Sequence, residues 1–246
     1  YDADERERTG APLTAARHDR GLSTEIGHGT DAHGNELSSQ KRQRLARMRR
    51  EQTRGRWQSK AERNLAHGLG EVRRLASTLE LSESIRDQAC QLFRSAQSED
   101  LLRGRSIEAI GAASIYGTCR CNQHPLLLED VVDAARVEST RVTNAYRTLN
   151  RELELPAPPM RPTSFVPRLI SELGLDHDIR RRANELAERA EGTALTNGCQ
   201  PSGVAAACVY LAAQEQGALI TQSTVASTAE VSVVTLRSRR DELQAI

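Results

Sequence analysis

The chain has 246 residues, enough for one or two domains that each bury a core of their own. Only 3% of the residues are aromatic, and alanine, leucine, arginine and glutamate abound, which favours helices over sheets. No apolar run reaches the roughly 20 residues that a helix needs to span a bilayer, and residues 1–10 lack the apolar core of a secretory signal. We therefore expect a cytoplasmic protein with no membrane partner.

The net charge of +1 conceals a basic run from Lys41 to Arg56, in which Glu51 is the one acidic residue. Such a run is typical of segments that bind polyanions, although a solvated, partly disordered linker has the same pattern. Residues 1–58 also lack an apolar core and are rich in glycine, arginine and serine. They predict an extended, largely irregular arm that needs a partner to become ordered.

An internal repeat follows the arm. The stretch IGAASIYGTCR from Ile110 resembles VAAACVYLAAQ from Val204, 94 residues later. The same offset aligns, without a gap, the apolar residues Leu75, Leu79, Leu81, Ile85, Ala89, Leu92, Val131, Ala135, Val137 and Leu149 with Leu169, Leu173, Leu175, Ile179, Ala183, Leu186, Val225, Ala229, Val231 and Leu243. Because the apolar spacing is helical in both copies, residues 59–154 and 165–246 predict two copies of one helical domain.

The stretch between the copies is rich in proline. Residues 155–164 contain Pro156, Pro158, Pro159 and Pro162, which forbid a continuous helix and favour extended backbone. They predict the boundary between the two domains. Within each copy, the alanine-rich stretch quoted above is apolar on nearly all sides, and such a helix belongs at the centre of its bundle.

The five cysteines are an odd number, and we expect reduced thiols rather than disulfides. Cys119 and Cys121 form a C-x-C pair with no second pair and no histidine at ligand spacing, so we expect no metal. Cys90 and Cys208 lie on apolar helical faces, where a cysteine is usually a small hydrophobic residue.

The sequence TQSTVASTAEVSVVTLRSRRDEL, which begins at Thr221, predicts a helix-turn-helix. The first helix ends before residues 230–232, which form the turn, and the second helix begins near Val233. On the second helix Val234 and Arg237 lie on one side, where a valine can touch a thymine methyl group and an arginine can reach a guanine edge or a phosphate. Two helices joined by a polar turn also occur in most helical bundles, so a purely structural role is the alternative at this point.

No combination of residues supports catalysis. The six histidines are scattered in polar stretches, no glycine-rich phosphate loop follows a strand, and no nucleophile has a partner at motif spacing. We therefore expect a protein that is not an enzyme.

The order of motifs along the chain resembles archaeal transcription initiation factor B, the counterpart of eukaryotic transcription factor IIB. The motifs are RTGAPLTAARHDRGLST, a basic linker, SKAERNLAHGLGEVRRLASTLEL, GRSIEAIGAASIYGTCR, a proline-rich linker, LISELGLDHDIRRRANELAERA, QPSGVAAACVYLAA and VSVVTLRSRRDEL. Together they run through essentially the whole chain. The resemblance implies an all-α fold of two tandem cyclin-like repeats, preceded by the arm.

The resemblance also implies a monomeric, non-enzymatic adaptor associated with the nucleoid. Its two repeats are expected to grip TATA-binding protein on promoter DNA, while the arm enters RNA polymerase and helps to open DNA and to choose the start site. The expected DNA-binding residues are Arg105, Ser106, Val234, Arg237, Arg239 and Arg240. The expected polymerase-contacting residues of the arm are Arg8, Thr9, Gly10, Ala11, Pro12, Arg17 and Arg20.

The sequence departs from the family pattern in two places. The basic residue that precedes the central helix of the second repeat is Cys199 here, whereas the first repeat keeps Arg105. Family members also begin with a zinc ribbon of paired C-x-x-C type, which is missing before YDADERERTG. Either the sequence is a fragment or this member lacks the module. We expect no cofactor in this chain and weaker recruitment of polymerase by it.

A cyclin proper is the alternative in a different class, since it would use the same helical repeats to dock a protein kinase. It would need neither the arm nor the basic linker. A helix-turn-helix recombinase is an enzymatic alternative, but it would need clustered carboxylates or a nucleophile at a fixed spacing from basic residues. The sequence shows neither.

Overall fold

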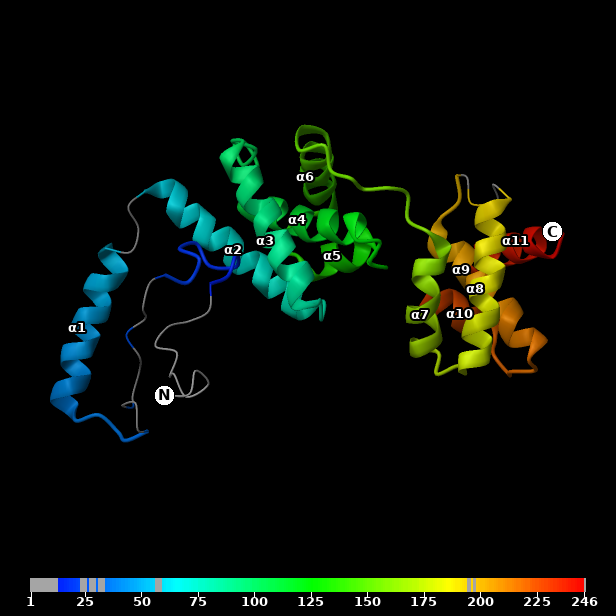
Figure 1. Cartoon of the computed structure of the whole chain (residues 1–246), viewed down its shortest axis with the longest axis horizontal. Coiled ribbons are helices and arrows are strands. Elements are labelled where there is room, and N and C mark those ends of the chain that lie inside the picture. The colour runs from blue at the N-terminus through cyan, green and yellow to red at the C-terminus, as the bar shows by residue number, and fades with distance from the viewer. Residues whose placement is uncertain are drawn as a thin grey trace, which may run out of the picture. The chain divides into compact units, whose positions relative to one another are not determined.

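The computed structural model of the chain describes residues 13–22, 26, 30, 34–55, 59–193, 196 and 198–245, with the side chains of residues 53 and 54 left aside. Throughout these residues the regular structure is helical, apart from one isolated bridge between Thr30 and Glu36. The helices are α1 (Ser39–Gly55), α2 (Lys60–Thr78), α3 (Glu83–Ser98), α4 (Ile107–Cys121), α5 (Leu128–Ala134), α6 (Ser139–Glu152), α7 (Pro162–Glu172), α8 (His177–Gly192), α9 (Pro201–Glu215), α10 (Gln222–Thr228) and α11 (Val233–Gln244) (Figure 1). The expected all-α fold is confirmed.

The repeat in the sequence is also a repeat of helices. Helices α8, α9 and α10 begin and end 94 residues after α3, α4 and α5, and α11 begins 94 residues after α6. Helix α7 ends 94 residues after α2 but is shorter, because it begins only at Pro162, after the proline-rich stretch. Proline is favourable in the first turn of a helix, where its missing N–H has no partner to lose. The helical part of the second repeat therefore starts inside the linker expected at residues 155–164.

The chain divides into two compact units, one of residues 1–118 and 127–155 and the other of residues 119–126 and 156–246. This division differs from the expected domains in residues 119–126, which group with the second unit. Three hydrogen bonds explain the difference. Arg120 Nη2 and Gln123 Nε2 donate to the carbonyl oxygen of Pro158 at 3.2 and 3.3 Å, and Arg168 Nη1 donates to that of Pro125 at 3.3 Å.

In the first unit, α4 is the central helix that its apolar sequence predicts. Ala112, Ala113 and Ile115 have no exposed surface. Gly117 of α4 allows a close approach, since an added Cβ there would lie 3.3 Å from Leu92 of α3, whereas one at Gly111 would make an ordinary contact of 3.6 Å with Val72 of α2. Small residues at the contact positions thus let three helices pack around one core.

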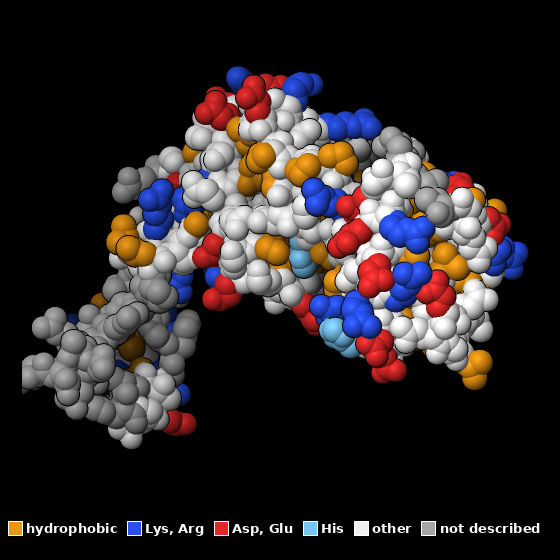
Figure 2. Space-filling model, turned by 45° about the vertical axis from the view of Figure 1, so that its right-hand side comes forward, with side chains coloured by type: hydrophobic (Ala, Val, Ile, Leu, Met, Phe, Trp, Pro, Cys, Tyr) orange, Lys and Arg blue, Asp and Glu red, His pale blue; other side chains and the backbone are white. Residues whose placement is uncertain are grey.

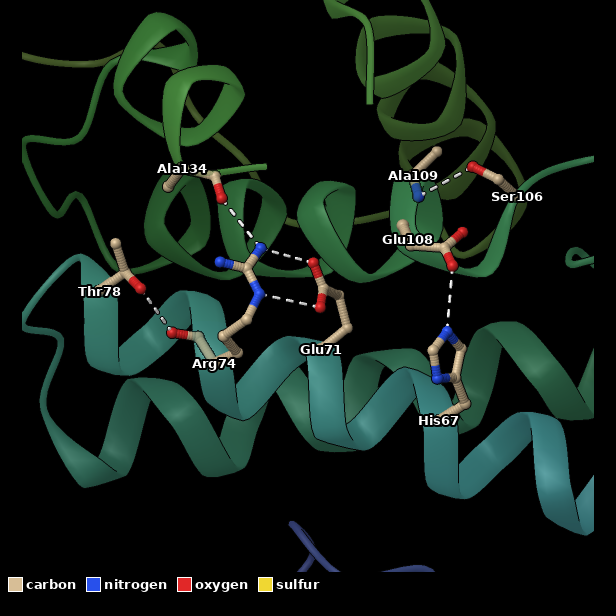
Figure 3. A network of polar contacts seen from close by, with 8 residues as sticks. All are labelled: His67, Glu71, Arg74, Thr78, Ser106, Glu108, Ala109 and Ala134. Carbon is tan, nitrogen blue, oxygen red and sulfur yellow. Dashed lines mark hydrogen bonds and ion pairs between the residues drawn. The ribbon is translucent and has the colours of Figure 1, made fainter. Parts of the chain in front are cut away.

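A polar network joins α2 to α4 and α5 at the edge of this core (Figure 3). Arg74 Nη2 lies 2.6 Å from Glu71 Oε1, and the same nitrogen donates to the carbonyl oxygen of Ala134, just at the end of α5, at 2.9 Å. The hydrogen bond from Arg74, more than any other interaction, lowers the pKa of the buried Glu71 carboxyl. Nearby, His67 Nε2 lies 3.0 Å from Glu108 Oε1 of α4. These contacts leave the charge of Glu71 paired and hydrogen-bonded, as burial of a carboxylate requires.

In the second unit, α9 is the central helix and contacts α7, α8, α10 and α11 (Figure 1). Its residues 202–209 are all buried, so the alanine-rich, apolar stretch around Cys208 belongs to the core of this unit. An ion pair joins α8 to the end of α9, where Arg182 Nε lies 2.6 Å from Glu215 Oε2. In the described part of the chain, no helix combines the length and the apolar character that crossing a bilayer requires.

The cysteines of the described residues are free thiols, and Cys90, Cys119 and Cys208 are buried. Burial raises the pKa of the Cys90 thiol to about 11 and that of the Cys208 thiol to about 12. Such thiols stay protonated at neutral pH and behave as small hydrophobic side chains.

One part of the expected irregular arm is helical. The basic run forms α1, which has leucine, alanine and methionine among its charged residues and whose Met48 is 48% exposed. Arginine, lysine, glutamine, alanine and leucine are good helix formers, and their intrinsic preference explains the helix.

We expect Gly68→Ala in α2 to destabilise the first unit. A Cβ at this position would lie 1.9 Å from Cζ of Phe93, a ring with no exposed surface and therefore no room to move. Overpacking of this kind costs about 1–3 kcal/mol of the free energy of unfolding. Gly70→Ala is the matched control, because nothing lies within 4 Å of its added Cβ. The control is expected to gain up to about 1 kcal/mol from helix propensity. Chemical denaturation followed by circular dichroism measures both changes, and equal stabilities would contradict the close contact.

Candidate nucleic-acid interface

The candidate interface is built on α10 and α11, and both helices begin with a side-chain cap. Thr221 Oγ1 accepts a hydrogen bond from the backbone N–H of Thr224 at 3.1 Å, and Ser232 Oγ accepts one from that of Thr235 at 3.0 Å. Between the helices, Glu230 has a φ of 54°, in the left-handed region that reverses the chain after a helix. In the structure the two helices are joined by this short turn, and the second helix begins at Val233.

The packing of α11 against the core of the second unit fixes the orientation of this helix. Leu236 has no exposed surface and Leu243 is buried, so one face of α11 points inward. On α9, an added Cβ at Gly203 would lie 3.2 Å from Cγ2 of Thr235, which shows how closely the two helices approach. The turn is held as well, since Glu230 pairs with Arg168 of α7 at 3.6 Å. The outward face of α11 is thus presented by a fixed scaffold.

Val234 and Arg237 lie on this outward face, as the sequence predicts. Val234 is 73% exposed. Arg237 is exposed too, and its Nε donates to Gln222 Oε1 of α10 at 2.8 Å. This bond orients the guanidinium through Nε and leaves Nη1 and Nη2 available for a bidentate contact with a guanine.

The next two arginines of α11 are engaged elsewhere. Arg239 Nη1 lies 2.6 Å from Cys199 Sγ, in the segment before α9, and 2.8 Å from Glu242 Oε2. Arg240 Nη2 lies 2.6 Å from Asp241 Oδ1. The structure therefore places Val234 and Arg237 on one exposed face. It also places the guanidinium of Arg239 beside Cys199, the residue that corresponds to Arg105 in the first repeat.

The two candidates of the first unit lie before and at the start of α4. Ser106 Oγ accepts a hydrogen bond from the backbone N–H of Ala109 at 3.1 Å and so caps the helix (Figure 3). Arg105 is exposed, and its Nη1 donates to the carbonyl oxygen of Leu101 at 2.9 Å. A cation beside the N-terminus of a helix, where backbone N–H groups point outward, is a suitable arrangement for a phosphate.

The arm candidates divide into two groups. Arg8, Thr9, Gly10, Ala11 and Pro12 lie outside the described residues. Arg17 and Arg20 belong to a turn-rich segment, residues 13–22, which is bound by Arg94 of α3.

Charge over the helical units is mixed rather than one-sided. On the face that Figure 2 shows, lysine and arginine side chains lie among aspartate and glutamate side chains. With a net charge of +1, attraction to a polyanion has to come from local groups of residues such as those of α11 and α1.

Sequence reasoning missed three residues that shape these sites. Gln222 orients Arg237, Gly203 admits α11 close to α9, and Arg94 binds the arm. Gly203 lies in the first turn of α9, where a small residue gives no signal of a helix packed against it. Gln222 and Arg94 are polar residues whose partners lie far away in the sequence, so the sequence gives no signal of their contacts either.

The chain is similar to known proteins over nearly its whole length. The model of the transcription factor TFIIB repeat matches residues 61–152 and 156–246. Transcription initiation factor IIB 5 of Halobacterium salinarum is 60% identical over 245 residues, which are 100% of this chain and 80% of that protein. Transcription initiation factor IIB 1 of the same organism is 46% identical over 237 residues, 96% of this chain and 81% of that protein. Transcription initiation factor IIB of Methanococcus maripaludis is 41% identical over 239 residues, 97% of this chain and 70% of that protein.

The resemblance in the sequence is therefore confirmed, and with it the two tandem cyclin-like repeats. The chain belongs to the transcription factor TFIIB family of transcription initiation factors.

Proposed function

We propose that the chain binds the complex of TATA-binding protein and promoter DNA, helps to recruit RNA polymerase and helps to set the start site. The observation that carries the proposal is the exposed face of α11, where Val234 and Arg237 stand on a helix whose opposite face is locked into the core. An α-helix held in this way fits the major groove of B-DNA. The role is that of an adaptor, and we propose no catalytic residue and no cofactor.

Two further groups support contact with the DNA backbone. Arg105 stands beside the N-terminus of α4, and Arg239 stands beside Cys199, just before the N-terminus of α9. Each pairs a guanidinium with the start of a central helix, in the first and in the second repeat. Backbone contacts of this kind position a protein on DNA, whereas base contacts such as those proposed for Arg237 select the sequence.

The arm supports the proposed contact with polymerase. Its helix α1 carries seven lysines and arginines and one acidic residue within 17 residues. A kinase-docking cyclin would have no use for such a helix, and this favours the transcription factor over that alternative. We expect the chain to act as a monomer.

Deleting residues 1–56 is expected to leave the complex with TATA-binding protein and promoter DNA nearly intact but to lower transcript output. The reason is that the two units bury their own cores and keep the DNA contacts, whereas the arm acts in polymerase. A mobility shift assay and a transcription assay on the same template measure the two effects. The circular dichroism spectrum and melting of the shortened chain serve as the folding control. Equal loss of both activities would show that the arm only holds DNA.

Arg237→Ala is expected to reduce preference for the element just upstream of the TATA box. A bidentate base contact is worth about 1–3 kcal/mol, and this contribution is absent on a duplex with scrambled flanks. Titration of both duplexes in the presence of TATA-binding protein measures the difference. Arg181→Ala removes the same charge from an exposed site on α8, where the side chain is 69% exposed, and is the matched control. The same loss of affinity on both duplexes would show that Arg237 contacts the DNA backbone rather than a base. No loss of affinity would show that α11 has only a structural role.

Arg239→Gln is expected to weaken binding to both duplexes alike and to lower the salt dependence by about one unit of slope, as loss of a phosphate contact does. Cys199→Ala is the control, because it removes the sulfur and leaves the guanidinium of Arg239 in place. Affinities measured at several salt concentrations give the slopes. An unchanged slope would show that Arg239 only stabilises the end of α11.

A further inference from the structure

The exposed guanidinium of Arg237 is held by a residue of the other helix of the pair. Arg237 Nε of α11 donates to Gln222 Oε1 of α10 at 2.8 Å, although the two residues are 15 positions apart. An exposed arginine on a helix otherwise samples many rotamers, and fixing it on a ligand costs the entropy of those rotamers. The hydrogen bond to Gln222 therefore orders the Arg237 side chain before any ligand is bound.

The position of Gln222 is itself fixed. It is the first residue of α10 and follows Thr221, whose Oγ1 accepts a hydrogen bond from the backbone N–H of Thr224 at 3.1 Å. One turn further along the helix, Val225 has no exposed surface. The amide that holds Arg237 thus stands on a capped helix that is packed against the core of the second unit.

The acidic residue that follows Arg237 by one turn of α11 is engaged by another arginine. Asp241 stands at the i+4 spacing at which a carboxylate and an arginine often pair on a helix. Asp241 Oδ1 instead accepts hydrogen bonds from Arg240 Nε at 2.9 Å and from Arg240 Nη2 at 2.6 Å. Arg237 is bound by a neutral amide, and this leaves the positive charge of its guanidinium for an electron-rich or anionic ligand.

We propose that Gln222 is a positioning residue for the reading of DNA. It aims the Arg237 guanidinium so that Nη1 and Nη2 meet the edge of a guanine, and it adds no negative charge near the phosphates. The inference rests on the proposed contact between α11 and DNA. Without Gln222 the arginine has to be ordered during binding, which lowers affinity for the matching sequence about two- to tenfold. Gln222 thus contributes to base recognition by acting through Arg237.

The hydrogen bond is tested first in the free full-length chain. Nuclear magnetic resonance relaxation of Arg237 Nε reports the order of this side chain. Gln222→Ala is expected to lower that order to the level of an exposed arginine such as Arg180 of α8. Gln214→Ala makes the same change at an exposed position of α9 and should leave the order unchanged. Unchanged order of Arg237 in Gln222→Ala would overturn the proposal.

The role in reading DNA is tested by a double-mutant cycle in the presence of TATA-binding protein. Gln222→Ala is expected to lower affinity about two- to tenfold for the duplex with the element upstream of the TATA box, and not for the duplex with scrambled flanks. In the Arg237→Ala background the same change should have no effect, because a residue that acts through Arg237 then has nothing to position. An equal loss in that background would show that Gln222 contacts DNA itself or supports the fold, and would overturn the positioning role.

The variant Gln222→Glu separates position from charge. A carboxylate holds a guanidinium at least as firmly as an amide does, so the relaxation of Arg237 Nε should still report an ordered side chain. Affinity for both duplexes is nevertheless expected to fall, because the new negative charge opposes the phosphates. Affinity equal to that of the parent chain would overturn the inference that the acceptor has to be neutral.

Failure of the proposed function would look different from failure of this inference. If α11 does not read DNA, Arg237→Ala binds both duplexes as the parent chain does, and the positioning role of Gln222 is overturned with it. The relaxation experiment would still report the hydrogen bond in that case. If Arg237→Ala loses preference for the upstream element and Gln222→Ala does not, the proposed function stands and the positioning role alone is wrong.

Discussion

The close approach of helices around α4 and α9 is the constraint on which the rest of the structure depends. Both helices are lined with alanine and glycine, and their neighbours pack at distances that one added methyl group would disturb. Packing at this density has few alternative arrangements, so the outer helices are fixed in rotation as well as in position. The consequence at Gly203 reaches the candidate interface, because the rotation of α11 decides that Val234 and Arg237 face solvent.

The same constraint explains why so much of the fold could be predicted from the sequence. The gapless offset of 94 residues located α8, α9 and α10 relative to α3, α4 and α5, since a repeat that keeps every core position must keep its helices. The helix-turn-helix was predictable for the same reason. Helix α1 was not, because it buries no core and its only signal is intrinsic helix preference, which is weak.

The candidate site was less predictable than the fold. Spacing on a helix identified Val234 and Arg237 as neighbours, and the structure places both on the exposed face. Spacing could not show that Arg239 turns toward Cys199, because that contact joins residues 40 positions apart. The arginine bound to the arm was hidden for a similar reason, since its partners are carbonyl oxygens, which every residue carries. Contacts between polar groups far apart in sequence become visible only with the fold.

Binding through main-chain oxygens has an evolutionary consequence. Arg94 places no demand on the side chains of the loop formed by residues 13–22, only on its turn geometry, which depends on the glycine with positive φ at position 21 and on the carboxylate at position 19. Ala16 and the side chain of His18 are buried in the loop, so the freedom to diverge among related factors that share a cell is left to exposed side chains such as Leu13 and Leu22. Such factors could exchange arm sequences while retaining a common resting position for the arm on the first repeat.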